Sequence, residues 1–237
     1  MSEQQLPVGC LSVVIPCFNE VDRIQQCVDL VLQQSAVSQI VVVDDGSTDG
    51  TSEIVRNLDN ERITVKHHPI NRGKGASVRT GFQLASAPFV VIQDSDLEQD
   101  PSDYGFLIRP LLDGEADVVY GSRFPDRCRL PGQYRLHFLA NRFLTGLSNA
   151  MTGLRLTDME TGYKAFRSEV LESFSIEESR FGVEPELTAK IARQGWRIRE
   201  VKVSYAPRSF ESGKEIGLRD GLRAVYCIFR YSLLPRV

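Results

Sequence analysis

Residues 88–101 read PFVVIQDSDLEQDP, and the rest of the chain is organised around this stretch. Its first part, Pro88 to Ile92, is a run of β-prone apolar residues bounded by proline and polar residues, which is typical of a buried strand. Carboxylates follow at alternate positions, namely Asp94, Asp96, Glu98 and Asp100. Open α/β sheets bind ligands at the carboxyl ends of their strands, so the pattern predicts a ligand site here.

The clustered carboxylates favour a divalent cation. Acids this close together repel one another, and a bound cation relieves the repulsion. Hard oxygen donors favour Mg²⁺ or Mn²⁺, which usually keep several waters and bridge to substrate phosphates. An isolated Asp-x-Asp is more often a solvated loop that caps the next helix, so the metal hypothesis depends on the neighbouring motifs.

Length, composition and charge limit the class of protein and the partners that the chain can have. The 237 residues, 42% of them hydrophobic, suffice for one sizeable core. The net charge is −3, but residues 196–237 carry nine Lys/Arg against four Asp/Glu, which favours an anionic group near the C-terminus. The five cysteines show no metal-ligand spacing and indicate reduced thiols of an intracellular protein. Without a signal peptide or membrane span, we expect a cytoplasmic protein with at most peripheral contact to the inner face of a membrane.

Strand-like runs alternate with helical patterns along the first half of the chain, and they cover residues 11–16, 39–43, 62–66, 88–92 and 117–120. This alternation predicts an α/β fold with a mostly parallel central sheet flanked by helices. Because parallel strands share a carboxyl edge, the loops carrying Glu20, Asp45, Lys74 and Asp94 are expected to meet. Arg123, in Gly-Ser-Arg after the fifth run, is expected at the same edge.

Together these loops predict a site for a nucleoside diphosphate. Asp44 and Asp45 can accept hydrogen bonds from a base or ribose. Lys74 lies between two glycines, which allows close backbone approach with a positive charge near a phosphate. Asp94 and Asp96 would hold the bridging metal. Each motif alone is also an ordinary turn or loop; their joint occurrence at successive strand ends favours the ligand site.

Five motifs, in this order, resemble those of the family 2 glycosyltransferases with the GT-A fold: VVIPCFNE (13–20), VVDDGSTD (42–49), NRGKG (71–75), DSD (94–96) and GSR (121–123). Within that family the chain most resembles the dolichol-phosphate mannosyltransferase-like, polyprenyl-phosphate sugar transferases. The resemblance runs from about Leu11 to the C-terminus. It implies an inverting, metal-dependent transfer of a hexose from a GDP- or UDP-linked sugar.

The resemblance also implies roles for individual residues. The donor would be bound by Pro16, Phe18, Glu20, Asp45, Lys74, Asp94 and Ser95. The metal would be bound by Asp94, Asp96 and Glu98, with Asp96 counted among the catalytic residues. Glu98 stands where such transferases often carry Gln, a departure that bears on its role as a ligand.

The acceptor is expected beyond the fifth strand. Arg123 and Arg135 bracket a loop broken by proline and glycine, and two guanidinium groups match a phosphate well. Asn141 lies on the helix predicted for residues 135–151. Asp158, in TDMETGYK, is the candidate general base for a hydroxyl acceptor, together with Arg123 as a catalytic residue. A lipid phosphate arrives already anionic, and Asp158 would then only orient its neighbours.

The last part of the chain is expected to close the site. Arg208 and Lys214 lie in a glycine-containing segment that resembles the family's lid over the diphosphate, although Glu215 stands where a second Lys is common. Residues 11–123, 124–216 and 217–237 would thus form a donor half, an acceptor half with lid, and a C-terminal helix of one domain.

On that last helix an apolar stripe is edged by arginines, and the stripe consists of Leu218, Leu222, Val225, Phe229 and Leu233. Packing on its own domain is the favoured interpretation, with a membrane interface as the alternative.

Three functions remain open: transfer to a polyprenyl phosphate, transfer to a soluble hydroxyl acceptor, or a non-catalytic subunit that binds a nucleotide sugar. No nucleic-acid partner is expected, and a membrane-anchoring partner or a second copy is allowed.

Overall fold

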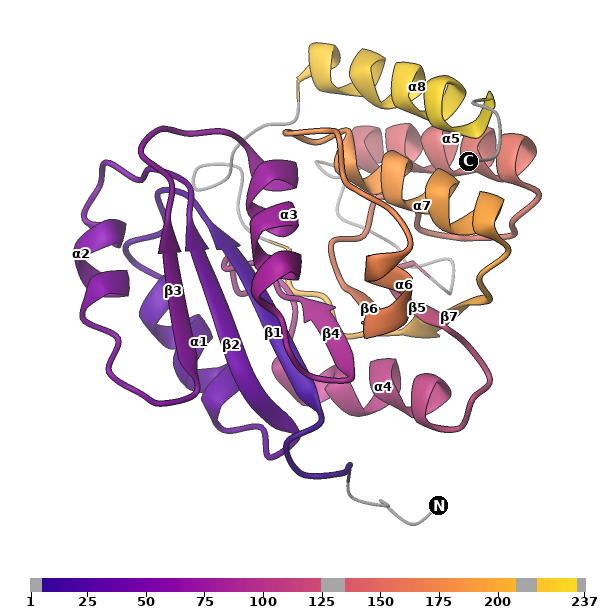
Figure 1. Ribbon diagram of the computed structural model, residues 1–237. Coiled ribbons are helices and arrows are strands. Elements are labelled where there is room, and N and C mark those ends of the chain that lie inside the picture. The colour runs from indigo at the N-terminus through magenta and orange to yellow at the C-terminus, as the bar shows by residue number, and fades with distance from the viewer. Residues whose placement is uncertain (1–5, 125–134, 208–216, 234–237) are drawn as a thin grey trace.

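The computed structural model describes residues 6–124, 135–207 and 217–233. Within them the chain alternates between strands and helices as far as β5 (Figure 1). The strands are β1 (Leu11–Cys17), β2 (Val37–Asp44), β3 (Ile63–His67), β4 (Phe89–Ile92), β5 (Val118–Ser122), β6 (Lys164–Arg167) and β7 (Ile198–Lys202). The helices are α1 (Ile24–Leu32), α2 (Thr51–Arg56), α3 (Lys74–Leu84), α4 (Tyr104–Leu112), α5 (Arg135–Thr152), α6 (Ser168–Glu172), α7 (Val183–Gln194) and α8 (Leu218–Leu233), with a 3₁₀ turn at Pro101–Asp103.

These strands form one sheet in the order β3-β2-β1-β4-β6-β5-β7. β1 pairs in parallel with β2 and β4, β2 with β3, and β5 with β7, so the mostly parallel sheet is confirmed. The alternation of apolar runs and amphipathic helices produces this arrangement because each helix returns the chain to the same end of the sheet. The carboxyl ends of β1, β2, β4 and β5 therefore share one edge.

Strand β6 was not predicted. It lies antiparallel between β4 and β5, with Val91 opposite Ala165 and Tyr120 opposite Lys164. Because β6 runs the other way, its first residues lie at the edge where β4 and β5 end. The segment just before β6, residues 158–163, is thereby brought to the same edge as Asp94 and Arg123.

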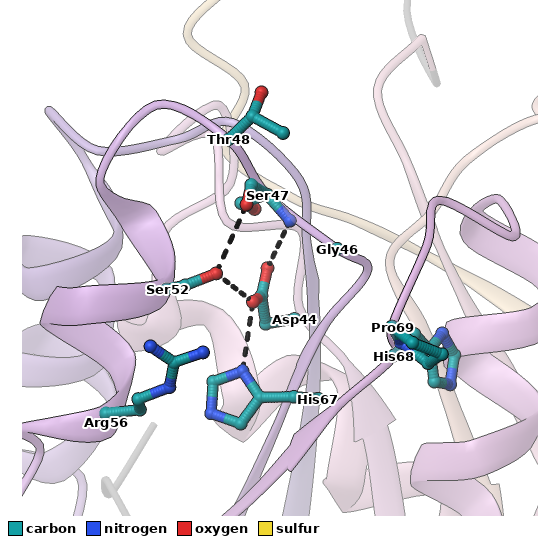
Figure 2. Close-up of a pocket in the computed structure, with 9 residues that line it drawn as sticks. All are labelled: Asp44, Gly46, Ser47, Thr48, Ser52, Arg56, His67, His68 and Pro69. Atoms are coloured by element: carbon teal, nitrogen blue, oxygen red, sulfur yellow. Dashed lines mark hydrogen bonds and ion pairs between the residues drawn. The ribbon is translucent and has the colours of Figure 1, made fainter.

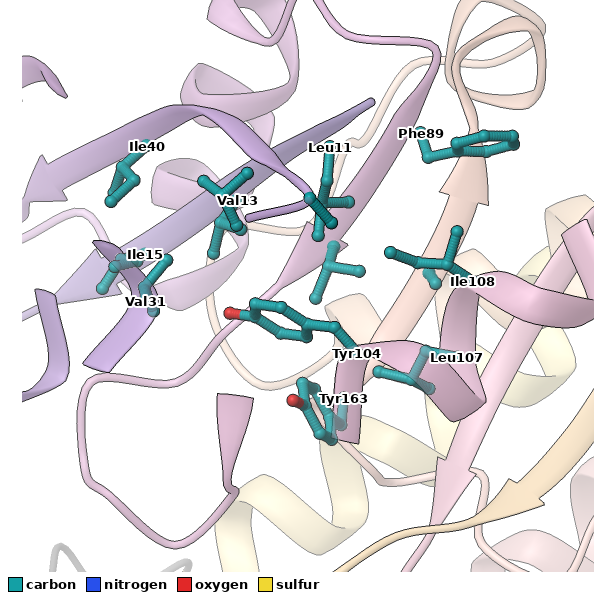
Figure 3. Packing of buried hydrophobic residues seen from close by; sticks show 14 of the residues in the cluster. Leu11, Val13, Ile15, Val31, Ile40, Phe89, Tyr104, Leu107, Ile108 and Tyr163 are labelled. Atoms are coloured by element: carbon teal, nitrogen blue, oxygen red, sulfur yellow. The ribbon is translucent and has the colours of Figure 1, made fainter. Parts of the chain in front are cut away.

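The helices cover both faces of the sheet. On one face α1 packs against β2, and α4 packs against β5, β6 and β7. Leu107 and Ile108 of α4 belong to the core on this face (Figure 3). On the other face α3 packs against β1 and β2, and α5, α7 and α8 pack on one another in a core cluster that includes residues of β5 and β6. None of the described helices has the length and apolar character needed to cross a bilayer.

Two buried tyrosines of this core fix the acidic loop after β4 (Figure 3). The hydroxyl of Tyr104 donates to Gln93 Oε1 over 3.0 Å, and that of Tyr163 donates to the Asp100 carbonyl over 2.8 Å. Both ends of residues 93–100 are thus anchored to the core, and this anchoring places the carboxylates between them.

Helix α8 is oriented differently from the favoured prediction. Its buried side chains are Ala224, Cys227, Ile228 and Tyr231, which pack toward α7 and the core. The side chain of Leu218, the first member of the predicted stripe, lies outside the described residues. Among the other members Val225 alone is partly buried against the core, and Leu222, Phe229 and Leu233 are exposed. The helix is held by a face of small and aromatic residues, so most of the stripe does not pack on its own domain.

Candidate active site

The loops after β1, β2 and β4 meet at the carboxyl edge of the sheet. The Asp45 N–H donates to the Cys17 carbonyl over 2.9 Å, and the Ser95 hydroxyl donates to the Pro16 carbonyl over 3.1 Å. Phe18 follows, half-buried, in the same loop. The structure therefore brings together the first, second and fourth strand ends, as the parallel topology requires.

Asp45 fastens the NRGKG loop to the second strand end. Its carboxylate accepts from the N–H groups of Arg72 and Gly73, the latter over 2.6 Å, and contacts His68 Nδ1 at 2.7 Å. With 3% of its surface exposed, Asp45 faces the protein. The sequence suggested a side chain presented to base or ribose, whereas the described contacts hold the loop that carries Lys74.

Asp44 has a similar local role. It accepts from the Ser47 N–H over 3.1 Å and the Ser52 hydroxyl over 2.5 Å, and it contacts His67 Nδ1 at 3.0 Å. Burial favours its protonated form, but these hydrogen bonds outweigh burial and hold the pKa of Asp44 below its ordinary value. Figure 2 shows the adjoining pocket of about 450 Å³, whose lining residues are Asp44, Gly46, Ser47, Thr48, Ser52, Arg56, His67, His68 and Pro69.

Lys74 bridges two carboxylates from different parts of the chain. Its Nζ lies 2.7 Å from Asp94 Oδ1, 3.0 Å from Asp94 Oδ2 and 3.2 Å from Glu184 Oε1. Burial disfavours the ammonium, but the two carboxylates outweigh it and raise the pKa of Lys74, so the side chain stays protonated. Gly162 packs against this pair: a Cβ there would lie 2.8 Å from Lys74 Nζ and would collide with Asp94.

The acidic loop offers oxygen ligands of the kind that Mg²⁺ and Mn²⁺ prefer. Asp96 Oδ1 accepts from the Glu98 N–H over 3.1 Å, and Leu97 between them has φ 63°, a strained value for a residue with a Cβ. Among the described residues no three His, Cys, Asp or Glu side chains are placed to hold a metal ion. A pair of carboxylates, Asp94 and Asp96, nevertheless fits these ions, which take one or two protein carboxylates and complete their shell with water and substrate phosphate.

Arg123, at the end of β5, forms a two-pronged ion pair with Asp158. Its Nε and Nη2 lie 2.7 and 2.9 Å from the two carboxylate oxygens, and Asn141 Nδ2 donates to Oδ1 over 2.7 Å. Burial would raise the pKa of Asp158, but the charge of Arg123 and these hydrogen bonds hold it below the ordinary value. The Asp158 carboxylate is completely buried, and it is hydrogen-bonded to both Arg123 and Asn141.

The Arg123 guanidinium lies beside the acidic loop. Its Cζ lies 5.4 Å from the centre of the Tyr205 ring. Ala206, which follows Tyr205, donates its N–H to the Glu98 carbonyl over 2.9 Å. A fixed cation thus faces the end of β4 from the end of β5. The two strands are separated by β6, so their ends lie roughly 10 Å apart.

Beneath Lys74 the structure holds a buried charged group that the sequence did not single out. Lys164 donates from Nζ to the carbonyls of Met159 and Thr161, and burial lowers its pKa to about 8. Burial, with the charge of Glu184, raises the pKa of Glu160 to about 8. Only the motif ETGYK (160–164) could have indicated these residues, because their partners come from distant segments.

Glu20 lies in the loop after β1 and pairs with Arg23 at 3.1 Å. Other predicted residues have side chains that lie outside the described part. Arg135 begins α5, but its side chain lies outside the described residues, as do Arg208 and Lys214 of the predicted lid.

Comparison with known proteins decides the family. The model of the glycosyl transferase family 2 matches residues 12–174, more than half of the chain. The chain is a family 2 glycosyltransferase. Some relatives of this glycosyltransferase are named as transferases that act on polyprenyl phosphates, in line with the resemblance seen in the sequence.

Three curated relatives align over most of their length. An uncharacterized protein of Methanocaldococcus jannaschii is 30% identical over 211 residues, covering 86% of this chain and 85% of its own. The undecaprenyl-phosphate mannosyltransferase of Micrococcus luteus is 28% identical over 236 residues, covering 94% of each. The polyprenol monophosphomannose synthase of Mycolicibacterium smegmatis is 27% identical over 214 residues, covering 86% and 80%.

Solved structures show the fold. Glucosyl-3-phosphoglycerate synthase from Mycobacterium tuberculosis, in complex with Mn²⁺, UDP and glucosyl-3-phosphoglycerate, superposes with a TM-score of 0.72 at 24% identity, covering 95% of this chain and 81% of that one. This glycosyltransferase therefore has the GT-A fold, as the sequence predicted.

Proposed function

We propose that this glycosyltransferase moves a hexose from a GDP- or UDP-linked sugar to a polyprenyl phosphate, with inversion at the anomeric carbon. Two relatives with matching length carry out chemistry of this class by name. The observation that supports the proposal most is Arg123, a guanidinium held by Asp158 and turned toward the acidic loop after β4. A fixed cation at the end of β5, a strand whose end lies about 10 Å from that of β4, suits an anionic acceptor across a bound sugar.

The donor would be held at the ends of β1, β2 and β4. Lys74, kept protonated by Asp94 and Glu184, is placed to meet the diphosphate. Mg²⁺ or Mn²⁺ held by Asp94 and Asp96 would neutralise charge that develops on the leaving diphosphate. In that arrangement the side chains bind and orient the donor before any bond changes.

The transfer itself needs few protein groups. An oxygen of the acceptor phosphate attacks the anomeric carbon from the face opposite the diphosphate, and the bond from that carbon to the diphosphate oxygen breaks. The bonding electrons leave with the nucleoside diphosphate, and no proton has to be removed from an anionic acceptor. Asp158 would then position Arg123 and Asn141, in keeping with its lowered pKa.

A soluble hydroxyl acceptor is the second candidate, because a structural neighbour was crystallised with a phosphoglycerate-derived product. That reaction needs a base, and Asp158 would have to leave Arg123 to act as one. A non-catalytic sugar-nucleotide-binding subunit would bind a donor without turnover.

Partition of radiolabelled sugar distinguishes these functions. The chain is incubated with Mn²⁺ and labelled GDP-mannose or UDP-glucose, in the presence of a polyprenyl phosphate or a phosphoglycerate. Label in the organic extract is expected. Label only in a water-soluble product, or none in either, would overturn the proposal.

Replacing Arg123 tests the acceptor role directly. Arg123→Met is expected to reduce transfer to the lipid phosphate by at least about 100-fold, because one charge-assisted contact to a reacting phosphate is lost. Arg197→Met is the matched control: Arg197 forms a similar two-pronged pair with Asp117, but at the start of β7, away from the site. Equal activity of the two variants would argue against Arg123.

A further inference from the structure

Helices α5 and α8 carry a group of exposed large apolar side chains. The group consists of Leu139, Phe143, Leu222, Tyr226, Phe229 and Leu233, whose exposed fractions lie between 42% and 69%. On α8 the four residues are spaced by four, three and four positions, so they form one stripe along the helix. We call these six residues the apolar face.

The apolar face lies on a side of α8 that does not pack on the domain, and of its six side chains Tyr226 contacts Arg223 and Arg230 of its own helix. Helix α8 packs along α5 and α7 (Figure 1), and it does so through Ala224, Cys227, Ile228 and Tyr231 on its buried side. The fold already uses that side for stability. A group of large exposed apolar side chains on two packed helices indicates a contact with something outside the domain.

The same two helices carry more basic than acidic residues. Helix α5 carries Arg135 and Arg142 and no acidic residue, and α8 carries Arg219, Arg223 and Arg230 against Asp220. Arg223 and Arg230 are paired with Glu178 and Glu177, so the charge available to a partner beside the apolar face comes from Arg142 and Arg219. Arg142 and Arg219 are exposed. Apolar side chains edged by arginines match a surface with hydrocarbon beneath anionic headgroups.

Helix α5 joins the apolar face to the candidate acceptor site. Asn141 points inward and donates to Asp158, whereas Leu139 and Phe143, two residues to either side, point outward. A surface bound to this helix would lie next to the residues that position Arg123. A second copy of the chain is a poorer occupant, because self-association through this face brings two cationic surfaces together.

We propose that the apolar face and its arginines dock this glycosyltransferase on an anionic lipid bilayer. The apolar side chains enter the interfacial region, and Arg142 and Arg219 meet the headgroups. The docking surface is separate from the acceptor site. The docking proposal therefore applies whether the acceptor is a lipid or a soluble molecule.

Vesicle co-sedimentation of the full chain tests the docking surface. We expect binding to phosphatidylcholine vesicles that contain phosphatidylglycerol, and weaker binding to phosphatidylcholine alone. The double variant Leu222→Ser/Phe229→Ser should lose at least about tenfold in affinity for both. Its melting temperature should stay unchanged because both side chains are exposed. Phe106→Ser is the matched control: Phe106 is 61% exposed on α4, on the other face of the sheet, and should bind as the wild type does.

Charge reversal separates the two parts of the surface. Arg142→Glu/Arg219→Glu should weaken binding to the anionic vesicles by about tenfold and leave binding to neutral vesicles unchanged. Absence of wild-type binding, or equal binding by the Ser double variant, would overturn the proposal. So would a dimer in sedimentation equilibrium that the Ser double variant abolishes. Transfer to a detergent-solubilised acceptor should persist in that variant, so failure of docking and failure of the proposed reaction are distinguishable.

Discussion

At the scale of single residues, the site depends on buried charges that come from distant segments. Lys74 lies between Asp94 and Glu184, and each of the three comes from a different element. The sequence predicted Lys74 and Asp94 because each follows a strand. It could not predict that Asp45 fastens the Lys74 loop, because that contact depends on backbone N–H groups 27 and 28 residues away. A side chain's type indicates what it can bind, but only the fold decides which partner reaches it.

Glu160 should make stability depend on pH. Its folded-state pKa of about 8 lies above the ordinary 4.5, so ionisation costs stability as pH rises from about 4.5 to 8. The pKa of Lys164 is lowered from 10.5 to about 8, so this group changes the stability at higher pH, between about 8 and 10.5. Between pH 5 and pH 7.5, the melting temperature of Glu160→Gln should therefore fall less than that of the wild type. Scanning calorimetry measures this difference, with the exposed Glu169→Gln as control.

An unchanged pH dependence in Glu160→Gln would contradict the assignment of this carboxyl. A loss of stability in the Gln variant at pH 7.5 would contradict it too, since the neutral amide should be preferred there.

At the scale of elements, the predicted strands and helices are present, and the differences have local causes. Strand β6 is four residues long and gains its stability from pairing with β4 and β5, so its own pattern carries little signal. On α8 the period predicted an amphipathic helix, but periodicity does not tell which side meets the domain. Ala224 and Cys227 are small enough to let α8 approach α7, and this contact leaves most of the larger apolar stripe outside.

Helix α3 begins in close contact with another loop, and glycine makes the contact possible. A Cβ on Gly75 would collide with the Glu178 carbonyl and lie 3.1 Å from the Ser179 carbonyl carbon, both of them backbone. Gly75→Ala should destabilise the protein by about 1–3 kcal/mol and shift Lys74. Gly105→Ala on α4, where a Cβ meets nothing within 4 Å, should be neutral or stabilise by up to about 1 kcal/mol. Urea unfolding of both variants checks this; equal effects would contradict the packing argument.

At the scale of the whole molecule, the antiparallel insertion of β6 unites the two halves. It puts the segment 158–163 at the edge where β4 and β5 end, so the donor loops and the Arg123–Asp158 pair face one another. The sequence predicted the shared edge of the parallel strands. The joining of the second half to that edge depends on pairings between residues more than 40 positions apart, which no local pattern reports.

The central claim is that the strand ends form one site for a nucleoside diphosphate, with Asp96 at its metal. Calorimetric titration of GDP and of UDP, each with Mn²⁺, tests it in the wild type and in Asp96→Asn, with Asp113→Asn on the C-terminal end of α4 as control. We predict that one nucleotide binds the wild type and the control, and that affinity falls by about tenfold or more without Mn²⁺ or in Asp96→Asn. Binding of neither nucleotide, or Mn²⁺-dependent binding by Asp96→Asn equal to that of the wild type, would contradict the account.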